Sequence, residues 1–223
     1  MSSRDVRSRL VRRAAKANLF LPGELADRLA AYYDLLSRWN RKINLTSIDN
    51  VDEAIDRLLL EPLAAVRHFP GPVHRLMDVG SGGGSPAIPF KLALPNTALT
   101  MVEVKARKSA FLREAIRQLR LEKAEVETTR FEELLARPEL HEAYDLLSLR
   151  AVRAETRVLT SLQAFLAPGG SLILFRGPEG AAQPSTVVPP LEWSGTFTLI
   201  DSLQSRLTLL TKRQIGTFGI ARV

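Results

Sequence analysis

Three glycines at alternate positions follow a short apolar segment near the middle of the chain. The segment covers residues 76–79, and Gly80, Gly82 and Gly84 come directly after it. Glycine permits a tight turn and lets backbone N–H groups approach a bound molecule closely. A turn of this kind between a strand and a helix predicts a cofactor-binding loop, but the glycines alone fit a dinucleotide equally well.

Two carboxylates beside this turn discriminate between cofactors. Asp78 stands two residues before the first glycine, where it would repel a pyrophosphate but suit a cationic amino group. Glu103 ends the next apolar segment, where a carboxylate accepts hydrogen bonds from the two hydroxyls of an adenosine ribose. Together the two acids predict S-adenosylmethionine as the cofactor. The alternative is that the glycine segment is a flexible loop and that Glu103 is a solvated strand end.

Later segments supply further candidate site residues. Phe131 and Glu132 follow the third predicted strand, where their backbone amides would read an adenine. Taken alone, a plain helix start with acids at its positive end explains these two residues better. Arg150 ends the fourth predicted strand, at the sheet edge where function concentrates in open α/β folds. A surface salt bridge is the alternative role for Arg150.

The elements that must hold these residues alternate along the chain. β-type segments at 75–79, 98–102, 124–128, 144–149 and 170–175 alternate with helical segments at 86–94, 107–119, 131–135 and 155–166. Four such repeats predict an α/β protein with a Rossmann-like, doubly wound and mostly parallel sheet. After a loop at 178–190, β-type segments at 197–203 and 206–210 predict an antiparallel addition, with a further strand near 217–223.

The first 70 residues have a different pattern. Apolar residues recur at helical spacing over 4–17, 25–36 and 52–66, and we expect Pro62 to kink or break the third helix. Pro70, Gly71 and Pro72 then stop the helical pattern. We therefore expect a helical N-terminal extension at 1–70, followed by an S-adenosylmethionine-binding methyltransferase domain at 71–223.

Composition narrows the classes of function. The 223 residues contain no Cys and only three His, so we expect no disulfide, no Cys nucleophile and no metal. The formal net charge of +7 favours a polyanionic partner such as nucleic acid, although a basic surface also aids solubility. No segment reaches the ~20 apolar residues that cross a bilayer, and no signal core follows the basic N-terminus, so we expect a cytoplasmic protein with no membrane partner.

At four places the sequence resembles the bacterial small-subunit (16S) ribosomal RNA guanine-N7 methyltransferases, also called the glucose-inhibited division protein B family. The matching segments are 39–46, 78–89, Glu103 with 107–112, and 148–151, within a likeness that spans residues 25–177. The resemblance implies a class I methyltransferase fold that binds S-adenosyl-L-methionine and acts on ribosomal RNA or the small ribosomal subunit. With the residues derived above, the expected cofactor site comprises Asp78, Gly80, Gly82, Gly84, Ser85, Glu103, Phe131, Glu132 and Arg150.

The sequence departs from the family pattern in the third helix and in the glycine loop. A family segment Arg-His-Phe-Leu-Asp-Ser reads Arg-Leu-Leu-Leu-Glu-Pro at 57–62. Ser85 stands where a bulkier apolar residue is common, Ala87 replaces glycine, and Glu103 replaces aspartate. The predicted cofactor is unaffected by these changes. The changes do allow the chain to be a divergent paralogue that acts on another substrate.

Guanine N7 carries an exposed lone pair and needs no deprotonation, so positioning and desolvation should dominate the chemistry. We expect Arg150 and Glu61 to orient the guanine. The resemblance places some basic and polar residues near the cofactor or the RNA. We expect the following residues to contact RNA: Arg38, Asn40, Arg41, Lys42, Asn44, Lys105, Arg107 and Lys108. For the asparagines and Lys42, an N-cap and a loop between helices is the alternative.

We expect the protein to be a monomer. Functions other than rRNA methylation also remain possible from the sequence. A small-molecule methyltransferase would share the cofactor pocket without needing basic N-terminal helices. A non-catalytic RNA-binding protein with a vestigial cofactor fold would tolerate the changes near Pro62 and at Ser85. An NAD-dependent enzyme fits Asp78 poorly.

Overall fold

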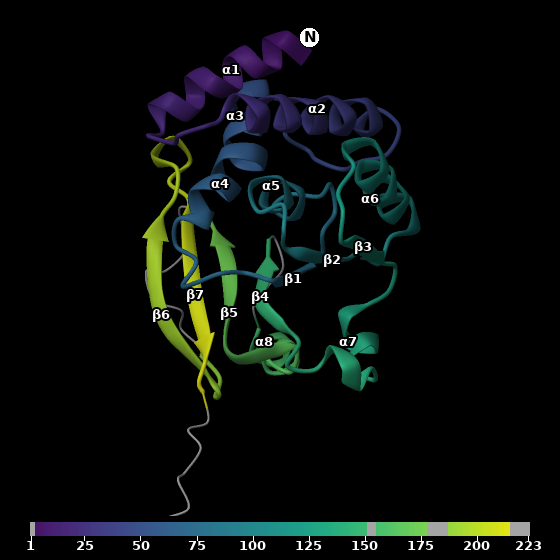
Figure 1. Cartoon of the computed structure of the whole chain (residues 1–223), viewed down its shortest axis with the longest axis vertical. Coiled ribbons are helices and arrows are strands. Elements are labelled where there is room, and N and C mark those ends of the chain that lie inside the picture. Colours follow the sequence, from purple (N-terminus) through teal and green to yellow (C-terminus); the bar gives the residue numbers. More distant parts are fainter. Residues whose placement is uncertain (1–2, 151–154, 178–186, 215–223) are drawn as a thin grey trace, which may run out of the picture.

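A seven-stranded sheet forms the centre of the computed structural model, which describes residues 3–150, 155–177 and 187–214 (Figure 1). The strand order is β3-β2-β1-β4-β5-β7-β6. The strands are β1 (Arg75–Val79), β2 (Ala98–Val102), β3 (Ala124–Glu127), β4 (Tyr144–Leu149), β5 (Leu166–Arg176), β6 (Leu191–Thr198) and β7 (Arg206–Lys212). The first five pair in parallel, while β7 runs antiparallel to both β5 and β6. The predicted Rossmann-like, mostly parallel α/β fold is therefore confirmed.

Helices cover both sides of this sheet. They are α1 (Ser3–Lys16), α2 (Gly23–Asn40), α3 (Val51–Ile55), the π-helical turn η1 (Asp56–Leu60), α4 (Glu61–Val66), α5 (Ala87–Ala93), α6 (Ala106–Leu119), α7 (Phe131–Leu134), η2 (Pro138–Leu140), α8 (Thr156–Leu162) and η3 (Asp201–Leu203). In Figure 1, α1 and α2 lie together at one end of the molecule, and α7 and α8 lie at the other. Within the described residues, no helix is both long and apolar enough to cross a membrane.

Alternate residues of the central strands bury their side chains in two separate clusters. Leu76 of β1 and Leu146 of β4 pack with the N-terminal helices, α5 and α6. Their neighbours Met77 and Leu147 pack with α8 on the other face of the sheet. This period of two is the geometry of a strand that is buried on both faces, and it explains why the central strands are almost continuously apolar.

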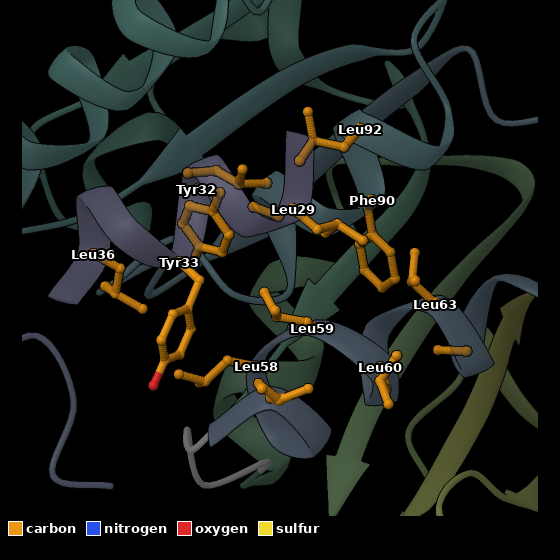
Figure 2. Close-up of a cluster of buried hydrophobic side chains, with 14 of the residues drawn as sticks. Leu29, Tyr32, Tyr33, Leu36, Leu58, Leu59, Leu60, Leu63, Phe90 and Leu92 are labelled. Carbon is orange, nitrogen blue, oxygen red and sulfur yellow. The ribbon is translucent and has the colours of Figure 1, made fainter. Parts of the chain in front are cut away.

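The N-terminal helices share their core with the sheet rather than forming one of their own. Figure 2 shows Leu29, Tyr32 and Leu36 of α2 facing the leucines of η1 and α4, with Phe90 of α5 beside them. All of these side chains belong to one continuous cluster, and Leu29, Tyr32 and Phe90 are at most 1% exposed. The division of the chain at residue 70 stays a prediction.

The third N-terminal helix was predicted to kink or break at Pro62; it continues through the proline and is irregular in the turn before it. Asn50 caps its start by accepting hydrogen bonds from the backbone of Asp52 and Glu53. The α3 helix then widens into η1, in which the Glu61 N–H donates to the carbonyl of Asp56, five residues earlier. Proline has no N–H to donate to the helical hydrogen bonds. The wide turn before Pro62 accommodates this missing donor, so the helix does not end there.

The C-terminal strands differ from the prediction at the edge of the sheet. The segment predicted as a strand at 197–203 contains only the end of β6, and Asp201–Leu203 forms a 3-10 turn. Most of β6 lies within 191–196, where exposed residues dominate because the strand has one neighbour and one open edge. Such a half-exposed strand carries little of the apolar signal by which strands are found. The strand expected near 217–223 lies outside the described residues.

Candidate active site

A cavity of about 680 Å³ opens where β1, β4 and β5 end. Its wall combines the glycine loop with the segment 44–48, the η1–α4 turn and the start of α6. The strand order reverses direction at β1 and β4, which is where open α/β sheets bind their ligands. A cavity of this size suits a cofactor-sized molecule.

The glycine loop adopts a backbone that other residues rarely adopt. Gly80, Gly82 and Gly84 have φ angles of 77°, 52° and 85°. The N–H groups of Gly80 and Ser81 both donate to the carbonyl of Val102, at 2.9 and 3.1 Å, which ties the loop to the end of β2. The loop is thus held in a defined shape, with Gly80 and Gly82 on the cavity wall.

Glu103 holds the loop from the neighbouring strand. Its two carboxylate oxygens accept one hydrogen bond each, from the N–H of Gly82 at 2.9 Å and of Lys105 at 2.8 Å. The side chain is buried, at 6% exposure. Each carboxylate oxygen keeps a second lone pair. Glu103 itself does not line the cavity, whereas Gly82 and Lys105, which donate to it, do.

Asp78 lies beneath the loop rather than on the cavity wall. The side chain is buried, and its Oδ1 accepts a hydrogen bond from the Ser148 hydroxyl at 2.5 Å. The other oxygen, Oδ2, has no partner in the described structure. Burial raises the pKa of the Asp78 carboxyl to about 6, and the hydrogen bond from Ser148 partly offsets this rise. An unpartnered buried carboxylate oxygen next to a glycine cradle fits the cationic amino-acid end of S-adenosylmethionine.

Arg150 and Glu61 form a buried ion pair on the wall of the cavity. Their side chains are 16% and 1% exposed, so this is not a surface salt bridge. Arg150 also donates from Nη1 to the Ser85 hydroxyl at 2.8 Å and stacks on the ring of Phe175, 4.8 Å from its centroid. Burial lowers the pKa of Arg150 to about 9, so the guanidinium stays charged at neutral pH.

Apart from the Arg150–Glu61 pair, the charged side chains on the cavity wall are positive. They are Arg57, Lys105, Lys108 and Arg176. Among the described lining residues, the single acid is Glu61, which is already paired with Arg150. A wall of one sign attracts groups of the opposite sign, so this cavity favours an anionic substrate such as a phosphate-bearing chain.

Not every predicted site residue reaches this cavity. Those that line it are Gly80, Gly82, Ser85, Glu61, Arg150, Asn44, Lys105 and Lys108. Arg38, Arg41 and Lys42 instead surround a separate hollow of about 420 Å³ beside Trp39. Arg107 is exposed on α6, and Phe131 and Glu132 begin α7 without lining the cavity.

Asn40 has a structural contact that matches the loop alternative. Its side-chain oxygen accepts from the N–H groups of Leu45 and Thr46 at 2.8 and 2.9 Å, and its nitrogen donates to the Thr46 carbonyl at 3.0 Å. Asn40 therefore shapes the segment 44–48, which in turn forms part of the cavity wall.

Sequence reasoning missed three residues at this site. Arg176 is the last residue of β5 and Arg150 directly follows β4, so the same argument from strand ends would have found Arg176. Phe175, which supports Arg150, looks like any core aromatic. Tyr32 lies in the apolar helical pattern at 25–36, which gives no sign that its hydroxyl donates to the Gly83 carbonyl at 2.6 Å.

The parallel sheet with an antiparallel β7, the positive-φ glycine loop and the acid at the end of β2 define a class I S-adenosylmethionine-dependent methyltransferase. Solved structures support this class at the level of the fold. A methyltransferase from Geobacter sulfurreducens superposes with a TM-score of 0.58 at 14% identity, over 82% of this chain and 89% of that one. A SAM dependent methyltransferase from Aquifex aeolicus gives a TM-score of 0.55 at 12% identity, over 79% and 97%.

The chain belongs to the GidB family, rRNA small subunit methyltransferase G, whose model matches residues 25–188. It is 35% identical to the ribosomal RNA small subunit methyltransferase G of Syntrophotalea carbinolica, over 80% of this chain and 81% of the relative. It is also 35% identical to the protein of the same name from Ralstonia nicotianae, over 78% and 79%. The family expected from the sequence motifs is therefore confirmed.

Proposed function

We propose that this protein transfers the methyl group of S-adenosylmethionine to N7 of a guanine in small-subunit ribosomal RNA. Membership of the methyltransferase G family supports the class of substrate. The observation that carries the proposal is the cavity wall itself, which holds four basic side chains in addition to the Arg150–Glu61 ion pair.

S-adenosylmethionine supplies a methyl group on a positively charged sulfur, which a nitrogen lone pair can attack directly. The site fits that chemistry because guanine N7 needs no base to remove a proton. Glu61, the acid on the described wall, is held in the ion pair with Arg150 and is poorly placed to act as a free base. The work left to the protein is to orient the guanine and to exclude water.

Arg150 is the residue that we assign to orienting the guanine. It lies on the cavity wall, carries a full positive charge and is fixed by Glu61, Ser85 and Phe175. Glu61 holds Arg150 and neutralises its charge, so that the guanidinium can remain in a buried position. The prediction that Glu61 is catalytic becomes the proposal that it positions Arg150.

Contacts to RNA phosphates would come from basic side chains around the mouth. Lys105 and Lys108 lie on the wall, and Arg107 is exposed on the same helix. Arg38, Arg41 and Lys42 form a second basic group around the hollow beside Trp39. Lysine and arginine contacts of this kind position a nucleic acid without reading its sequence.

We propose further that the protein acts as a monomer in the cytoplasm.

The test is methyl transfer from radiolabelled S-adenosylmethionine to ribosomal RNA and to isolated small subunits, followed by nucleoside analysis. Label in 7-methylguanosine is the expected result. Label in another nucleoside would leave the class intact but overturn the target atom. Cofactor binding without any methyl transfer to RNA would overturn the proposal that ribosomal RNA is the substrate.

A further inference from the structure

The carbonyl of Leu58 lacks its regular helical donor. In an α-helix this carbonyl accepts from the N–H four residues later, and that residue is Pro62, which has no N–H. The wide turn η1 lies at the same place, with the Glu61 N–H directed to the carbonyl of Asp56. Leu58 is buried, at 9% exposure, and a buried carbonyl is normally paired with a donor.

A side chain from the cofactor loop supplies the missing donor. The Ser85 hydroxyl donates to the Leu58 carbonyl at 2.9 Å, from a position 27 residues further along the chain. A hydroxyl has one proton, so this bond leaves only its lone pairs for other partners. Arg150 donates to those lone pairs from Nη1 at 2.8 Å. The hydrogen bonds therefore run in one direction, from Arg150 to Ser85 to Leu58.

This chain of bonds fixes one side of the Arg150 guanidinium. Glu61 pairs with another side, and the ring of Phe175 lies against the face. A guanidinium is planar, with its donors in a rigid fork. Ser85 and Glu61 contact its donors and Phe175 contacts its face, so together they hold it in a single orientation. Of these contacts, the one through Ser85 also links Arg150 to the Leu58 carbonyl, to which Pro62 cannot donate.

We propose that Ser85 is a positioning residue, which closes the gap that Pro62 leaves in the helix and thereby orients Arg150 at the cavity wall. The proposal rests on the proposed function, because the orientation of Arg150 acts through transfer to the guanine. Pro62 and Ser85 work as a pair: the proline frees the carbonyl, and the serine uses it as an anchor.

A double-mutant cycle on thermal stability tests the contact without any substrate. Ser85→Ala should lower the Tm by roughly 3–6 °C, since it strands a buried carbonyl and one Arg150 donor. In the Pro62→Ala background residue 62 regains an N–H for Leu58, so the same Ser85→Ala change should cost less than half as much. An equal loss of Tm in both backgrounds would overturn the pairing of Ser85 with Pro62.

Kinetics then separate positioning from stability. We expect Ser85→Ala to lower kcat about 10-fold to 100-fold at a temperature where the variant is folded, with the KM for S-adenosylmethionine changed less than about 3-fold. Ser85→Thr keeps the hydroxyl and should restore most of kcat. Ser161→Ala, on α8 across the sheet, is the matched control for the serine change.

An unchanged kcat in Ser85→Ala would overturn the positioning role. A Ser85→Ala protein that differs from the wild type only by a raised KM for S-adenosylmethionine would also overturn it. Absence of methyl transfer by the wild-type protein would instead count against the proposed function. In that case the thermal cycle still decides whether Ser85 serves the carbonyl freed by Pro62.

Discussion

The hydroxyl of Tyr32 donates a hydrogen bond to the carbonyl of Gly83 at 2.6 Å, and so joins the N-terminal helix α2 to the glycine loop. A Cβ on Gly83 would lie 3.1 Å from Leu36 of the same helix, which shows how closely the loop and α2 pack. The helical extension therefore packs directly against the glycine loop and helps to fix its shape.

Tyr32→Phe should weaken cofactor binding while leaving the helix in place. The change removes one hydrogen bond and strands the Gly83 carbonyl, at a cost of about 1–2 kcal/mol. We expect the Kd for S-adenosylmethionine to rise roughly 5-fold to 20-fold by calorimetry. Tyr33→Phe is the control, since Tyr33 lies on the same helix and interacts with Ser37 rather than with the loop. Equal effects of the two changes would contradict this role for Tyr32.

Gly84→Ala should disrupt the loop itself. A Cβ at this position would lie 2.5 Å from Cδ1 of Ile88, and the φ of 85° is strained for any L residue. We expect a loss of about 2–4 kcal/mol in the free energy of unfolding, measured by denaturation, together with loss of cofactor binding. Gly71→Ala is the matched control because nothing lies within 4 Å of its Cβ. Wild-type stability in Gly84→Ala would show that the loop can relax.

Asp56 connects three distant parts of the chain and should be costly to change. Its buried carboxylate pairs with Arg13 of α1 and accepts from the Ser202 hydroxyl of η3 at 2.9 Å. Asp56→Ala leaves Arg13 without this partner, and we expect denaturation to show a loss of about 3 kcal/mol. Asp27→Ala breaks the exposed pair with Arg7 and should cost less than about 1 kcal/mol. Similar costs at the two sites would contradict a structural role specific to Asp56.

The raised pKa of Asp78 predicts a pH dependence of opposite sign for stability and for cofactor binding. Burial raises the pKa from 3.8 to about 6 in the folded protein, so between these values the folded state binds more protons than the unfolded one. The contribution of Asp78 to stability therefore falls by about 2 kcal/mol as the pH rises from 4 to 6. Because the ionised carboxylate is the form that attracts a cationic amino group, the affinity for S-adenosylmethionine should rise through pH 6.

Asp78→Asn provides the comparison for both measurements. The variant should lose the rise in cofactor affinity between pH 5 and 7 in calorimetric titrations, and its denaturation curves should lack the Asp78 contribution between pH 4 and 6. Affinity in the wild-type protein that is flat across pH 6 would show that Asp78 does not contact the charged end of the cofactor.

The basic wall should act on RNA and not on the cofactor. Changing Lys105 and Lys108 together to Gln should raise the KM for RNA and reduce the slope of log affinity against log salt by about 1 for each lysine. Arg157→Gln on α8 is the control on the opposite face of the sheet. An unchanged salt slope in the lysine variant would place the RNA elsewhere.

The sequence by itself determined the central elements and the cofactor loop. Strands β1 and β2 fall at the predicted residues, because strands buried on both faces are continuously apolar. Gly80, Gly82 and Gly84 all have positive φ, a backbone that only glycine adopts easily. The acid at the end of β2 followed from the same local order of strand, turn and helix.

The tertiary structure alone decided which residues share the site. The contacts of Tyr32 with Gly83, of Ser85 with Leu58 and of Asp56 with Ser202 join residues 51, 27 and 146 positions apart. It also separated Arg38 and Arg41 from the main cavity, and it kept Phe131 away from the wall. Hydrophobic periodicity reports which face of an element is buried, whereas the partner that buries it depends on how the whole chain packs.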